Sequence, residues 1–174
     1  MSKTKVSIGL INPKSPTNVG SVMRAAGNFQ VDSVFYTGKR YDRAIQLNND
    51  TENLSRKVGQ SIPLSDTTCL IDNADKNAEI ICIEFAENAI ALPDYQHPDN
   101  ALYIFGPEDG TINQAIIDRA DAVVYIPTTG CMNLAATVNV VLYDRLSKSS
   151  LVIDNNELIR QSRDINNNLK VKQY

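Results

Sequence analysis

The stretch Ile126-Pro-Thr-Thr-Gly-Cys-Met-Asn-Leu134, which runs into a long apolar segment, decides the fold of this 174-residue chain. We expect a strand over Ala122–Ile126 to end at the proline, and a helix to follow over Ala135–Arg145. Apolar residues mark both sides of this helix, with Leu134, Val138, Val141 and Leu142 on one side and Ala135, Ala136, Val140 and Tyr143 on the other. A helix that is apolar all round is covered on both sides. One cover is then the chain's own sheet, and the other side is open to a second subunit.

Strand and helix patterns alternate in the rest of the chain. The expected strands cover Val6–Ile11, Val34–Thr37, Ile80–Ile83 and Leu102–Phe105. The expected helices cover Val19–Phe29, Thr51–Val58, Thr67–Lys76, Ile112–Arg119 and Asp154–Arg163, with Thr17 or Asn18 capping the first and Asp66 the third. This rhythm predicts an α/β fold, a mainly parallel sheet with helices on both faces. We expect one domain over residues 1–150, and a C-terminal helix and flexible tail over residues 151–174.

The composition is that of an ordinary globular protein, with 43% hydrophobic and 21% charged residues. No apolar run reaches the length of a membrane span, and no signal peptide is visible, so we expect no membrane partner. Three cysteines without framework spacing indicate reduced thiols and a cytoplasmic location. The single histidine, His97, lies in a Gln-His-Pro-Asp loop, which argues against a histidine-based metal site and against a Ser/His triad. We therefore expect no metal.

The net charge of −3 hides an uneven distribution. Residues 66–121 contain 12 acidic and 2 basic side chains, a net charge of −10, whereas the remainder contains 15 basic and 8 acidic ones, a net charge of +7. This asymmetry is compatible with a phosphate-binding face on an acidic protein, and equally with chance clustering of surface charge.

Common nucleotide and metal motifs are missing from the sequence. No G-x-G-x-x-G follows the first expected strand, no G-x-x-x-x-G-K-[ST] occurs, and there is no C-x-x-C pair. The sequence therefore argues against a dinucleotide-binding Rossmann domain, a P-loop NTPase and a zinc knuckle.

Three expected strands each end in an unusual loop. They are Asn12-Pro-Lys-Ser-Pro-Thr-Asn18-x-Gly20 leading to Arg24, Phe105-Gly-Pro-Glu-Asp-Gly110, and the opening stretch. Ligands of α/β sheets bind beyond the carboxyl ends of strands, so these loops mark a candidate site. Each loop also has a structural interpretation: Asn18 and Asn133 as helix caps, Arg24 as a solvated side chain, Cys131 as a small buried residue, and the Gly-Pro-Glu-Asp-Gly segment as a turn.

Together the three segments resemble the motifs of the SPOUT superfamily, and specifically its TrmH-like RNA ribose 2′-O-methyltransferases. Asn12…Asn18-x-Gly20-x-x-x-Arg24 is similar to the first motif, and Phe105-Gly106-x-Glu108-x-x to the second, although Gly110 stands one residue before the usual glycine. Ile126-Pro127…Met132-Asn133-Leu134 is similar to the third, with Cys131 in place of the usual serine. The resemblance covers about residues 5–148.

The resemblance implies a C-terminal deep trefoil knot, a homodimer through the helix Leu134–Leu142, and S-adenosylmethionine as cofactor. The residues implied to line the cofactor pocket are Ile83, Gly106, Ile126, Cys131 and Met132. Methyl transfer to a ribose 2′-hydroxyl of RNA would depend on Arg24, which matches the essential arginine of the family. Asn18, Glu108 and Asn133 would hold Arg24 and the ribose in place.

Candidate RNA contacts are the residues Asn12, Lys14, Lys39, Arg40, Arg43, Arg56 and Lys57. A compact chain without a flanking RNA-binding domain favours tRNA over rRNA. Two alternatives stay open. One is a homologue that binds cofactor and RNA without catalysis. The other is a flavodoxin-like nucleotide-binding or receiver-type domain, although the acidic cluster that it needs after the first strand is replaced by Asn12-Pro13.

Overall fold

A computed structural model describes residues 4–47, 62–150 and 154–172. The predicted helix Thr51–Val58 and the candidate RNA contacts Arg56 and Lys57 lie outside these ranges. No helix in the described ranges is both long and apolar enough to cross a bilayer.

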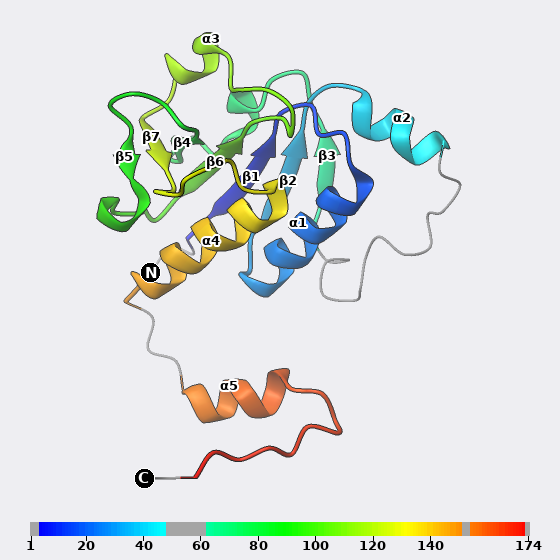
Figure 1. Cartoon of the computed structure of the whole chain (residues 1–174), viewed down its shortest axis with the longest axis vertical. Coiled ribbons are helices and arrows are strands. Elements are labelled where there is room, and N and C mark those ends of the chain that lie inside the picture. Colours follow the sequence, from blue (N-terminus) through cyan, green and yellow to red (C-terminus); the bar gives the residue numbers. More distant parts are fainter. Residues whose placement is uncertain (1–3, 48–61, 151–153, 173–174) are drawn as a thin grey trace.

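Seven parallel strands form one sheet, in agreement with the predicted α/β class (Figure 1). Their order is β3-β2-β1-β6-β4-β7-β5. The strands are β1 (Val6–Leu10), β2 (Ser33–Tyr36), β3 (Leu64–Asp66), β4 (Glu79–Ile83), β5 (Ile90–Ala91), β6 (Ala101–Phe105) and β7 (Ala122–Tyr125). Because β1 pairs with β6, with Leu10 beside Phe105, strands almost a hundred residues apart in sequence end next to each other.

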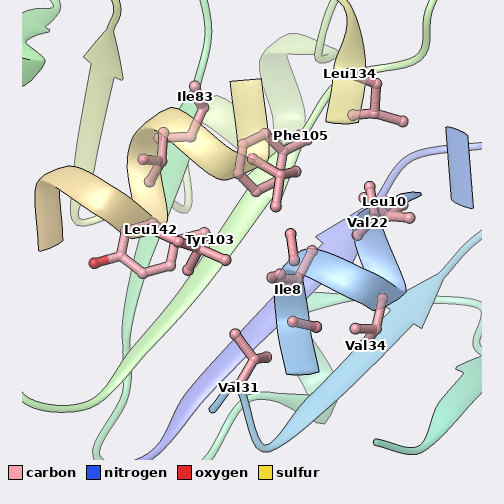
Figure 2. Close-up of a cluster of buried hydrophobic side chains, with 14 of the residues drawn as sticks. Ile8, Leu10, Val22, Val31, Val34, Ile83, Tyr103, Phe105, Leu134 and Leu142 are labelled. Carbon is pink, nitrogen blue, oxygen red and sulfur yellow. The ribbon is translucent and has the colours of Figure 1, made fainter. Parts of the chain in front are cut away.

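Two helices, α1 (Pro16–Asn28) and α4 (Leu134–Ser147), pack side by side over one face of the sheet (Figure 1). Alternate strand residues supply that core, and Figure 2 shows Ile8, Tyr103 and Phe105 gathered with Val22 of α1 and Leu142 of α4. The opposite face carries a smaller core of Leu70, Ile80, Cys82, Leu102, Ile104 and Ile112, covered by the short helix α3 (Gln114–Ile117) and the 3₁₀ turn η2 (Ile71–Asn73). Both faces are therefore covered, as predicted.

The predicted helix Thr67–Lys76 is wrong. Asp66 ends β3 instead of capping a helix, and only η2 is helical in this segment. The side chains of Thr67 and Asn73 bond each other and the backbone of Cys69, which gives the chain a polar turn in place of a helical ladder.

Four short elements lie in segments for which the sequence predicts no helix or strand. Helix α2 (Arg40–Leu47) lies between the predicted strand Val34–Thr37 and the predicted helix Thr51–Val58. Strand β3 and the two-residue strand β5 lie at the sheet edges, and the 3₁₀ turn η3 (Leu92–Asp94) follows β5. Edge strands of two or three residues exist only through pairing with a neighbour, so local sequence carries little signal for them.

Helix α5 (Asn155–Ser162) lies apart from the sheet domain, and its residues are exposed (Figure 1). Asp154 caps it through the N–H groups of Asn156 and Glu157, so the helix begins one residue after the predicted start at Asp154. The boundary near residue 150, the flexibility of the tail and the trefoil knot stay predictions.

Candidate active site

The loops that follow β1 and β6 are joined by the carboxylate of Glu108. It accepts hydrogen bonds from the backbone N–H groups of Lys14 (3.0 Å) and Ser15 (3.2 Å) and from Asn18 Nδ2 (3.3 Å). Partial burial by itself raises the pKa of Glu108, but these donors and its own backbone N–H outweigh burial and lower the pKa. Glu108 is therefore an ionised group held in one orientation.

Asn18 extends this contact to the third loop. Its Oδ1 accepts from Asn133 Nδ2 (3.0 Å), while Asn133 Oδ1 caps α4 by accepting from the N–H groups of Ala135 and Ala136. The residue that caps α1 is Ser15, followed by Pro16 at the first helical position, which corrects the predicted cap at Thr17 or Asn18. Since Asn18 is not the cap, its side chain is available to link Glu108 to Asn133.

A pocket opens beside this Glu108–Asn18–Asn133 chain, at the carboxyl ends of β4, β6 and β7. Its walls are Ile83, Glu84, Phe85, Phe105, Gly106, Pro107, Glu108, Gly110, Tyr125, Ile126, Thr128, Cys131, Met132, Leu134 and Thr137. The five residues implied to contact cofactor are all among them. A side chain at Gly106 has little room, because a Cβ there would lie 3.3 Å from Ile112 Cγ1 and 3.4 Å from Glu84 Oε2.

Two features of this pocket differ from expectation. Cys131 is exposed at the pocket and is not a small buried residue. Glu84 was not singled out, although it directly follows a buried strand, and the polar residue at the carboxyl end of such a strand is the signal that would have found it.

The chain matches a known protein family. A family model described as the SpoU rRNA Methylase family matches residues 5–143. The chain belongs to this family. The match confirms the resemblance drawn from the three motifs.

A curated relative of this SpoU-family chain is the tRNA (cytidine-2′-O-)-methyltransferase TrmJ of Methanocaldococcus jannaschii, 27% identical over 158 residues, which are 82% of this chain and 68% of TrmJ. Two solved structures share the fold. The TrmH/SpoU tRNA modifying enzyme of A. aeolicus has a TM-score of 0.70 at 14% identity, over 83% of this chain and 75% of that one. AviRb of Streptomyces viridochromogenes has a TM-score of 0.66 at 17% identity, over 85% of this chain, which spans 59% of AviRb.

Arg24 stands away from the pocket of its own chain. It is exposed on α1, it is not among the pocket walls, and within the described residues no hydrogen bond joins it to Asn18, Glu108 or Asn133. The contacts predicted to hold Arg24 in place are therefore absent from this single chain. Arg24 faces solvent on α1, the helix that packs beside α4.

Two of the candidate RNA contacts, Lys14 and Arg40, are paired with Asp109, the neighbour of Glu108. Arg40 donates two hydrogen bonds to Asp109 (2.8 and 3.0 Å), and Lys14 Nζ lies 3.2 Å from the same carboxylate. These cations lower the pKa of Asp109 to about 2. Lys39 and Arg43 are exposed. Asn12 adopts a left-handed φ of 42° and packs against Gly38, where any Cβ would clash at 2.2 Å with Asn12 Oδ1, so its role here is to shape the loop.

The described residues contain no group of three His, Cys, Asp or Glu side chains that could hold a metal ion.

Proposed function

We propose that this SpoU-family chain transfers a methyl group from S-adenosylmethionine to a ribose 2′-hydroxyl of RNA, with tRNA as the substrate class. The observation that carries the proposal is the meeting of three strand ends at one pocket, with Glu108, Asn18 and Asn133 bonded in series at its rim. The tRNA activity in the name of the TrmJ relative supports the choice of substrate.

The pocket suits S-adenosylmethionine. Apolar side chains such as Ile83, Phe105 and Leu134 line it, with an aromatic pair at Phe85 and Tyr125 whose ring centroids lie 6.1 Å apart. Such surfaces hold an adenine ring, while the backbone around Gly106 and Ile126 offers hydrogen bonds to its edge. When bound, the cofactor supplies an activated methyl group on a sulfonium, so the protein has only to align the reactants and manage one proton.

Arg24 is the residue proposed to act on the RNA. A guanidinium stays protonated in proteins, so Arg24 does not take the 2′-hydroxyl proton itself. We assign it to a bidentate grip on the neighbouring phosphate, where its charge also stabilises the developing alkoxide; the proton passes to the phosphate or to water.

A second copy of the chain completes this arrangement. Helix α4 buries Leu134, Ala135, Val138, Val141 and Leu142 against its own sheet, but leaves Tyr143 64% and Leu146 37% exposed. A homodimer over the outer side of α4 and the adjoining α1 covers this apolar surface and brings Arg24 into the interface, where it joins a pocket rim. The three free cysteines fit the reducing cytoplasm in which we place the reaction.

The direct experiment incubates the purified protein with S-adenosylmethionine carrying a labelled methyl group and with total tRNA or rRNA. The modified nucleotide is then mapped by its resistance to alkaline hydrolysis and by mass spectrometry. Labelled 2′-O-methyl tRNA is expected. Cofactor binding without transfer to either RNA overturns the proposal in favour of the non-catalytic homologue, and no cofactor binding overturns both.

A further inference from the structure

The walls of the pocket include two carboxylates, Glu84 and Glu108, and no lysine or arginine. Glu108 is already held by Lys14, Ser15 and Asn18 at the rim. Glu84 has no cationic partner among the described residues, so its negative charge is left for whatever occupies the pocket.

The Glu84 carboxylate is fixed in place by the backbone. Oε1 accepts from the N–H of Phe85 (2.9 Å) and Oε2 from the N–H of Ile112 (2.9 Å), which belongs to the loop after β6. Each oxygen keeps a further lone pair. The missing side chain of Gly106 leaves Oε2 uncovered on that side, because an added Cβ would lie only 3.4 Å from it.

The surroundings of Glu84 strengthen its field. Ile83, Phe105 and Leu134, which are pocket walls like Glu84, are at least nine-tenths buried. Charge interactions are stronger at a given distance in such surroundings than in water. An oriented carboxylate beside an apolar wall therefore distinguishes a cation from a neutral molecule of the same shape, and Glu84 is the one whose charge no other described group of the rim engages.

We propose that Glu84 makes the pocket selective for the positively charged methyl donor over the product that remains after transfer. This inference rests on the proposed function. In the reaction the sulfonium–methyl bond breaks, the methyl carbon bonds to the ribose oxygen, and the sulfur keeps the electron pair as a neutral thioether. Donor and product otherwise carry the same groups, so Glu84 favours entry of the donor and release of S-adenosylhomocysteine.

The test measures dissociation constants by calorimetry for three probes. S-Adenosylmethionine is cationic at sulfur, S-adenosylhomocysteine is neutral there, and sinefungin carries an ammonium group in place of the sulfonium. For Glu84→Gln we expect roughly tenfold weaker binding of both cationic probes and less than a twofold change for S-adenosylhomocysteine, because an amide keeps the size but loses the charge. The matched control, Glu87→Gln, changes an exposed glutamate of the same loop that is not a pocket wall, and should leave all three constants unchanged.

The outcomes separate this inference from the proposed function. An equal loss of affinity for all three probes shows that Glu84 shapes the pocket or binds a shared group, and overturns the selectivity. Unchanged affinities overturn it as well. Thermal unfolding of the ligand-free variant checks that the loss of one backbone contact has not unfolded the loop. Failure of the wild-type protein to bind any probe overturns the proposed function itself.

Discussion

Helix α4 is attached to the domain by a polar cluster at each end. The two clusters differ in how many of their hydrogen-bonding groups remain open to solvent or ligand. At its N-terminus, Asn133 bonds Asn18, which bonds Glu108, and the chain of side chains lies open to solvent beside the pocket. At its C-terminal half, Asp144 and Arg145 bond a cluster around His97, whose side chain is only 4% exposed.

The His97 cluster is closed upon itself. Asp144 Oδ2 accepts from Nε2 (2.9 Å), so Nε2 carries the proton and Nδ1 accepts from the Tyr103 hydroxyl (2.6 Å). Arg145 donates to the same hydroxyl (3.1 Å), and Lys148 pairs with Asp144 (2.7 Å). A neutral imidazole satisfies every one of these bonds, which makes the cluster a structural anchor for the loop before β6.

The two ends of α4 distinguish residues that stabilise the fold from residues available to bind a ligand. Polar groups that hydrogen-bond one another hold the helix in place. Groups whose charge or lone pairs have no partner of opposite charge in the described part of the fold, such as Glu84 and Arg24, face a pocket or an outer surface. Changes at the closed end should therefore affect stability, and changes at the open end should affect binding and rate.

The largest effect is expected at the closed end. His97→Ala removes the acceptor of the Tyr103 hydroxyl and one of the two donors to Asp144, which keeps its ion pair with Lys148. The substitution should lower the free energy of unfolding by about 3 kcal/mol, measured in urea. Cofactor affinity of the folded fraction should stay within about twofold of wild type. A large loss of affinity without a loss of stability would show that the cluster belongs to the site.

Arg24→Lys tests the open side. The lysine keeps the charge but loses the bidentate fork, so we expect about a hundredfold lower rate of methyl transfer, or about 2.7 kcal/mol, with an unchanged unfolding midpoint because the side chain is exposed. Asn28→Lys, at an exposed position further along the same helix, is the control for an added cation. Near wild-type turnover in Arg24→Lys contradicts the assigned role.

Asn133 both caps α4 and bonds Asn18 beside the pocket, and two substitutions test these roles separately. Asn133→Ala removes the cap of α4 and should cost about 1 kcal/mol of stability. Asn133→Asp keeps an oxygen for the cap but no donor for Asn18, so stability should be retained while transfer falls about tenfold. Equal activity of Asn133→Asp and wild type would reduce this residue to a helix cap.

The smallest expected effect is on pH dependence. Burial lowers the pKa of His97 below 6.5, against the opposing influence of Asp144. The unfolded chain then binds the proton more readily than the folded one, so stability is full above pH 6.5 and falls as the pH drops through the folded pKa, by at most about 1.4 kcal/mol per pH unit. His97→Gln should remove this slope near pH 6 in urea titrations; an unchanged slope would assign it to another group.

Several parts of the site follow from the local sequence. Alternating strand and helix patterns predict the α/β class, and polar loops at the carboxyl ends of β1, β6 and β7 predict where side chains meet. Asn133 could be predicted as a helix cap, because a side-chain amide directly before an apolar helical run can accept hydrogen bonds from the first backbone N–H groups. The predicted helix over Thr67–Lys76 is wrong because side chains there hydrogen-bond the backbone and replace helical hydrogen bonds. Helix propensity does not account for this competition.

What only the tertiary structure decided are contacts between residues far apart in the chain. The pairing of β1 with β6 brings Glu108 to Asn18, 90 positions away, and the packing of α4 brings Asp144 to a histidine that looked like part of an ordinary loop. The opening stretch of sequence determined a strand, a loop and an apolar helix, because periodicity and caps are local. Which side of that helix faces solvent, and that the carboxylate of Glu84, directly after β4, lines the same pocket, depended on the order of strands in the sheet.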